Sequence, residues 1–103
     1  MKEIGRSGTE AYLKRAVRAA GGVTRKWVSP GRNNVPDQIV IWPGGRKGDR
    51  RPQALVHFVE LKAPGAKPRV GQLREHQRLR DLGCGVFVLN APEFIDQYVE
   101  QFK

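Results

Sequence analysis

The chain has 103 residues, enough for one small domain with a single core (residues 1–103) and too few for a second domain. Nineteen Lys and Arg against ten Asp and Glu give a formal charge of +9, with cations in nearly every segment. This balance favours a polyanionic partner, and nucleic acid ranks ahead of a membrane because no basic amphipathic anchor helix is present. On charge alone, the alternative is a basic protein that is merely soluble.

Several classes of protein are disfavoured. The single cysteine, Cys84, can form no internal disulfide and supplies no zinc cluster, so we expect a reduced, cytoplasmic protein. The N-terminus is polar and the apolar runs are short, so we expect neither a signal peptide nor a membrane span. The loop from Pro43 to Pro52 lacks the G-x-x-x-x-G-K-[ST] spacing, so no nucleotide cofactor is expected.

The first predicted element is a helix from Ser7 to about Ala20. Its apolar stripe ends at Gly21-Gly22 and consists of Tyr12, Leu13, Ala16, Val17 and Ala20. Ser7 and Glu10 have the spacing of a capping box, and Glu10 also borders the apolar stripe. Two interpretations of Glu10 therefore stay open: a helix cap, or a functional carboxylate that points toward the sheet.

Three strands are predicted next. The first covers Val23 to Ser29, with Val23, Trp27 and Val28 as its apolar anchors. The second covers Asp37 to Trp42 and begins with an aspartate directly after Pro36, where Asp37 is either an ordinary turn residue or a functional one.

The third strand, Ala54 to Ala63, is apolar on both faces and is predicted to be buried on both sides. It ends with Glu60 and Lys62, which share a face because they are two residues apart. A charged pair at the end of a buried strand is costly unless it has a use.

The rest of the chain predicts a helix from Val70 to Leu82, a strand from Val86 to Leu89 and a helix from Pro92. For the first of these helices, the candidates for the inner side are Leu73, His76, Gln77, Leu79 and Leu82. The last helix has a stripe that suits either the core or a partner subunit: Phe94, Ile95, Tyr98, Val99 and Phe102. The order αβββαβα predicts an α/β fold in which a helical crossover makes the sheet mixed.

One group of residues has the composition of a catalytic site. In an antiparallel hairpin the start of one strand lies beside the end of the next, so Asp37 can approach Glu60 and Lys62. Carboxylates with a backbone carbonyl and waters suit Mg²⁺ or Mn²⁺. The lysine would then orient or help to deprotonate an attacking water.

The sequence Pro36-Asp37 followed by Glu60-Leu61-Lys62 resembles the PD-(D/E)XK nuclease motif, and its surroundings resemble the VRR-NUC (virus-type replication-repair nuclease) family. The resemblance covers almost the whole chain, from Glu10 through the strand 35–39, the segment 58–65 and the helix with Gln72 and His76 to the strand 86–88. It implies a restriction-endonuclease-like core, αβββαβ, with a mixed sheet flanked by helices and an extra C-terminal helix. The loop from Pro43 to Pro52 is longer and more basic than a minimal member would need.

The resemblance also implies residue roles. Asp37 and Glu60 would bind the divalent metal together with the Leu61 carbonyl, and Glu10 would lie near it directly or through water. Lys62 would serve the attacking water. Gln72 would lie near the site or the scissile phosphate, and His76 is expected in core packing or DNA contact rather than catalysis.

The activity implied is a Mg²⁺- or Mn²⁺-dependent endonuclease that hydrolyses DNA phosphodiesters. Small stand-alone members resemble homodimeric, structure-selective nucleases of DNA repair that act on branched DNA such as Holliday junctions. The alternative is a catalytically inactive or regulatory DNA-binding module that keeps the nuclease fold. Eight cations are candidates for phosphate contacts: Arg6, Arg32, Arg46, Lys47, Arg50, Arg51, Lys67 and Arg69. For the four in the loop from Pro43 to Pro52, the alternative is that they are solvated and contact no partner.

Overall fold

Four strands form one mixed sheet in the computed structural model, which describes residues 6–45 and 51–103. In spatial order they are β1 (Val23–Lys26), β2 (Gln38–Trp42), β3 (Leu55–Leu61) and β4 (Gly85–Leu89). β2 is antiparallel to both β1 and β3, whereas β3 and β4 are parallel. The predicted meander and helical crossover are therefore confirmed.

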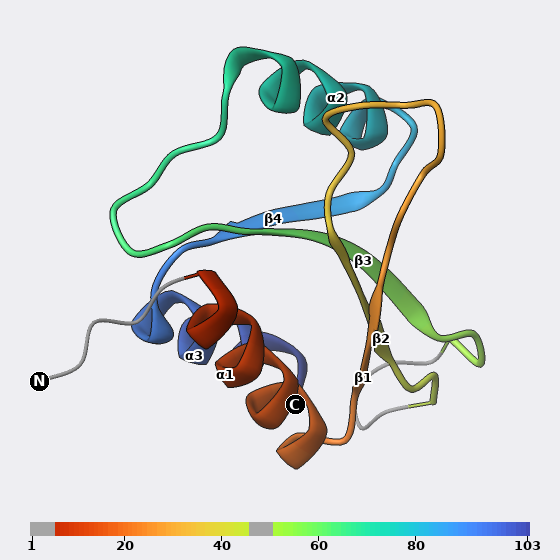
Figure 1. The fold of residues 1–103 in the computed structure, drawn as a ribbon. Coiled ribbons are helices and arrows are strands. Elements are labelled where there is room, and N and C mark those ends of the chain that lie inside the picture. The colour runs from red at the N-terminus through yellow and green to blue at the C-terminus, as the bar shows by residue number, and fades with distance from the viewer. Residues whose placement is uncertain (1–5, 46–50) are drawn as a thin grey trace, which may run out of the picture.

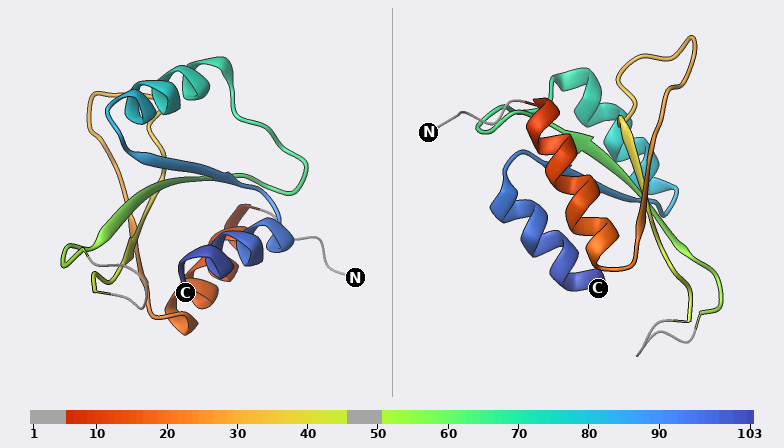
Figure 2. Two further views of the ribbon diagram at one scale, coloured as in Figure 1. Left: turned by 180° about the vertical axis from the view of Figure 1, so that it is seen from behind. Right: turned by 60° about the horizontal axis from the view of Figure 1, so that its bottom comes forward.

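Helices cover the two faces of this sheet unequally. α1 (Arg6–Ala19) and α3 (Pro92–Phe102) lie side by side against one face, and α2 (Val70–Asp81) lies over the other (Figures 1 and 2). The predicted order αβββαβα and the α/β class are confirmed. Among the described residues, no helix has the length and apolar character needed to cross a bilayer.

The hydrophobic core lies between the sheet and the α1–α3 pair. The stripes predicted for the first and last helices point into it, with Leu13, Val17 and Ile95 fully buried. Phe94 is the exception: it was predicted in the stripe of the last helix and is 46% exposed. From the sheet, alternate residues of β2 and β3 reach the same core, including Val40, Trp42, Val59 and Leu61. The indole Nε1 of Trp42 donates to the Tyr98 hydroxyl at 3.0 Å, which satisfies a donor that would otherwise be costly to bury.

Two strand predictions are wrong in part. The first strand ends at Lys26, and of its expected anchors Val28 is 70% exposed while Trp27 packs on Phe58 with ring centroids 4.9 Å apart. β3 is buried on both faces only toward its end, because Val56 is 48% exposed where α2 does not cover the sheet. The side of the sheet beneath α2 is thus covered mainly at the end that carries Glu60.

Candidate active site

Asp37 and Glu60 lie at the same end of two adjacent strands. Gln38 is paired with Val59, so the next positions outward, Asp37 and Glu60, oppose each other on the α2 face. The backbone N–H of Leu61 donates to Asp37 Oδ1 at 3.1 Å. The carboxylate of Asp37 therefore lies across the end of β3, as predicted from the hairpin.

The Glu60 side chain is held almost completely out of water. It is 4% exposed, with Lys62 Nζ 3.7 Å from Oε2 and His76 Nε2 3.7 Å from Oε1. Burial, assisted by the charges of Arg80 and Lys62, lowers the pKa of His76, so its imidazole is neutral at neutral pH. Of these two groups, Lys62 is therefore the cation that offsets the buried carboxylate.

The inner side of α2 is polar. Its buried residues are Gln72, Glu75 and His76, whereas Leu73 is 49% and Leu82 81% exposed. The predicted inner side was correct for His76 and the half-buried Leu79 and wrong for Leu73, Gln77 and Leu82. The physical reason is the surface that this helix faces. α2 covers the end of the sheet that carries Asp37 and Glu60, and polar side chains are compatible with the buried charge there.

Gln72 is buried in the first turn of α2, and its Oε1 accepts a hydrogen bond from the Arg69 N–H at 2.8 Å. Because the amide oxygen is used in this contact, the amide nitrogen is the part of Gln72 suited to a further interaction, as a donor.

The Glu10 side chain contacts its own helix. α1 begins at Arg6, one residue before the cap predicted at Ser7. Its Oε1 lies 3.4 Å from Lys14 Nζ, one turn along the same helix. Across residues 6–45 and 51–103, no three His, Cys, Asp or Glu side chains gather closely enough to hold a metal, so Glu10 does not join Asp37 and Glu60 in this structure.

The donor set nevertheless fits a hard divalent cation. Carboxylate oxygens of Asp37 and Glu60 and the backbone carbonyl of Leu61 are ligands of the kind that Mg²⁺ and Mn²⁺ take. Mg²⁺ binds through one or two carboxylates and keeps several waters, so a third protein carboxylate is not required.

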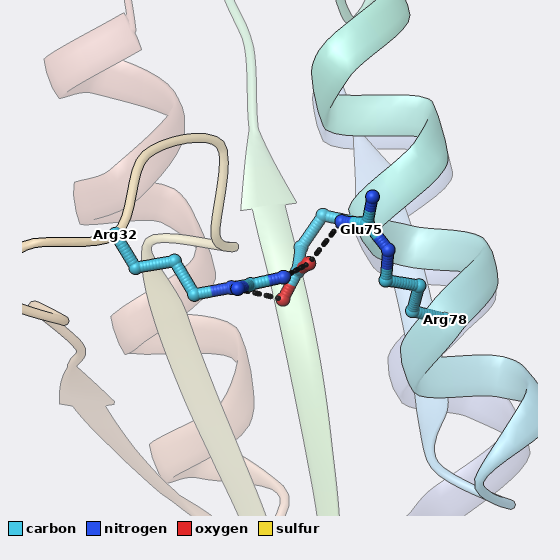
Figure 3. A network of polar contacts seen from close by, with 3 residues as sticks. All are labelled: Arg32, Glu75 and Arg78. Atoms are coloured by element: carbon cyan, nitrogen blue, oxygen red, sulfur yellow. Dashed lines mark hydrogen bonds and ion pairs between the residues drawn. The ribbon is translucent and has the colours of Figure 1, made fainter.

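An ion pair between the exposed Arg32 and the buried Glu75 ties the loop before Asp37 to α2. Arg32 donates from Nη2 to Glu75 Oε1 at 2.6 Å and from Nε to Oε2 at 3.3 Å, while Arg78 Nη1 donates to the same Oε1 at 3.0 Å (Figure 3). The hydrogen bonds from Arg32 hold the pKa of Glu75 below its usual range. We call the pair Arg32 and Glu75 the loop clamp.

A second contact supports the loop clamp. Asn34 has a positive φ of 70°, and its side chain reaches the start of α2 at Gly71. A Cβ at Gly71 would lie 2.7 Å from Asn34 Nδ2, so a larger residue there would displace the Asn34 side chain. The loop is thus fixed to α2 at two points within five residues of Asp37.

Comparisons with known proteins identify the family of this chain. The chain is 44% identical over 93 residues to "Putative nuclease p44" of Acyrthosiphon pisum secondary endosymbiont phage 1, covering 90% of each protein. A solved structure described as "VRR_NUC domain" matches 95% of the chain with a TM-score of 0.77 and 33% identity, and 97% of that structure is covered. The chain belongs to the VRR-NUC family. No protein-family model matches it.

Within this VRR-NUC chain, sequence reasoning missed Glu75 and Arg78. The spacing of Glu75 and Arg78 is that of a helical i, i+3 ion pair and could have indicated a contact. The link from Glu75 to Arg32 joins residues 43 positions apart, and no local pattern indicates it.

The cations expected to contact DNA are divided between the two ends of the sheet. Lys67 and Arg69 are exposed in the β3–α2 connection, which follows the strand end that carries Glu60. Arg51 is exposed at the β2–β3 hairpin. This hairpin lies about 17 Å from Asp37, which is the length of the five residues of β2. The Arg6 side chain and Arg46, Lys47 and Arg50 lie outside the described residues.

The loop clamp predicts a measurable effect on Asp37. Replacing Arg32 by Ala should let the loop open locally, so the Leu61 amide, which donates to Asp37, should exchange its hydrogen about tenfold faster. Amide exchange followed by NMR provides the measurement.

Arg78→Ala is the matched control, because it removes a cation from Glu75 without detaching the loop. Unchanged Leu61 exchange in Arg32→Ala, or an equal increase in Arg78→Ala, would contradict a positioning role for the loop clamp.

Proposed function

We propose that this VRR-NUC protein is a divalent-metal-dependent endonuclease that hydrolyses DNA phosphodiester bonds. The observation that carries the proposal is the opposition of Asp37 and the buried Glu60 at one end of β2 and β3, with Lys62 3.7 Å from Glu60. Family membership and the similarity to a phage protein named as a nuclease support it.

The residues have distinct roles in this proposal. Asp37, Glu60 and the Leu61 carbonyl hold the cation, which stabilises charge on the phosphate and makes water more acidic. Lys62, half-buried beside Glu60, orients the attacking water and offsets negative charge. Gln72 donates from its amide nitrogen to a phosphate oxygen, and Glu10 acts through water near the cation.

Branched DNA is the preferred substrate in this proposal, and the protein works as a homodimer. Two copies related by a two-fold axis present two sites, which matches the symmetry of a four-way junction. The formal charge of +9 on each copy supports sequence-independent contact with the phosphate backbone.

Cleavage assays test the catalytic assignment. With Mg²⁺ or Mn²⁺ the parent should cut DNA and with EDTA it should not. Asp37→Asn, Glu60→Gln and Lys62→Ala should each lose about a hundredfold or more in rate, because each removes a group acting in the transition state. The exposed Glu93→Gln on α3 should match the parent.

No cleavage of any substrate in the presence of metal would favour a DNA-binding module without turnover. Variants at Asp37, Glu60 and Lys62 that cut as fast as the parent would show that the chemistry lies elsewhere.

The substrate and assembly are tested together. The parent should cut a four-way junction at least about tenfold faster than linear duplex of the same sequence, and sedimentation at micromolar concentration should give a dimer. A monomer that cuts both substrates equally would remove the two-fold argument while leaving the active site unaffected.

A further inference from the structure

A basic groove lies between the exposed side of α1 and the edge strand β1. It has a volume of about 390 Å³ and is lined by Lys14, Arg18, Gly22, Val23, Thr24 and Arg25. Three of these six residues are cations and none is acidic. None of the three belongs to the candidate active site or to the cations that the sequence associates with DNA.

The face of α1 that borders the groove continues to Glu10. Glu10, Lys14 and Arg18 are spaced four residues apart and follow one helical face. At 1.5 Å per residue, Arg18 lies about 12 Å along the axis from Glu10. A DNA duplex advances 3.4 Å per nucleotide, so this distance corresponds to roughly three to four nucleotides.

The third cation comes from the sheet edge. Within the described part of the chain, β1 pairs only with β2, so its outer edge is available to a ligand. Arg25 is exposed, and its Nη1 donates to its neighbour's carbonyl, Thr24 O, at 2.8 Å, which holds the guanidinium beside this edge. Arg18 and Arg25 thus approach the groove from the helix and from the strand.

We propose that this groove, the α1–β1 groove, binds the phosphodiester backbone of the DNA arm about three to four nucleotides from the bond that is cut. The proposal rests on the proposed function, because the distance is counted from Glu10, which the proposed function places near the cation. Lys and Arg side chains suit a polyanion, although Lys14 is shared with Glu10 at 3.4 Å. None of the six lining residues is an Asn or Gln that could read bases, so the contact is sequence-independent.

The groove could instead owe its charge to protection of an edge. Exposed charged residues on an edge strand prevent pairing with another chain. The two explanations differ in what removal of the cations does, since one predicts weaker DNA binding and the other predicts self-association.

The test compares two triple variants with equal loss of charge. The groove variant is Lys14→Gln/Arg18→Gln/Arg25→Gln, and the control is Arg15→Gln/Arg74→Gln/Lys103→Gln, whose residues are exposed and outside the groove. Binding of a 20-base-pair duplex is measured in EDTA over a range of salt concentrations. Circular dichroism melting checks that both variants fold as the parent does.

The groove variant should bind at least about tenfold more weakly than the control, and the slope of log K against log salt should be shallower by about two to three. The same salt slope in both variants, or unchanged binding with self-association of the groove variant in sedimentation, would overturn the proposal. Because binding in EDTA needs no turnover, a groove effect without cleavage would refute only the proposed function. Cleavage with equal salt slopes would refute only the groove.

Discussion

The burial of one carboxylate constrains the rest of the structure. Glu60, taken as a whole residue, is 3% exposed at the end of a strand. Removing an ionised carboxylate from water costs on the order of several kcal/mol. Lys62 Nζ and His76 Nε2 each lie 3.7 Å from a Glu60 oxygen, beyond hydrogen-bond distance. A site that holds a carboxylate in this way favours a cation with its own positive charge.

This constraint separates the two faces of the sheet. The face toward α1 and α3 contains the apolar core, together with a buried polar group in which Trp42 Nε1 donates to the Tyr98 hydroxyl and His57 Nδ1 lies 2.6 Å from the same oxygen. The other face carries Asp37 and Glu60, and α2 covers it with Gln72, Glu75 and His76. A polar helix face contributes little hydrophobic stabilisation. α2 is also held by the loop clamp, which ties it to the loop before Asp37.

The sequence predicted the sheet order, the helix faces of α1 and α3 and the approach of Asp37 to the end of β3, because these follow from periodicity and hairpin register. It failed for α2, where we expected leucines to point inward and the buried carboxylate instead requires polar neighbours. It could not reveal the loop clamp, since the pairing of Arg32 with Glu75 depends on tertiary structure. Glu10 was expected near Asp37 and Glu60, but a partner one turn away, Lys14, engages it in this structure.

We infer that Glu60 is buried to hold a divalent cation, and calorimetric titration with Mn²⁺ tests this inference without relying on turnover. The comparison uses the parent, Glu60→Gln and the exposed control Glu93→Gln. Our account predicts equal affinity in the parent and the control, and an affinity at least about tenfold lower in Glu60→Gln. Equal Mn²⁺ affinity in all three proteins would contradict it.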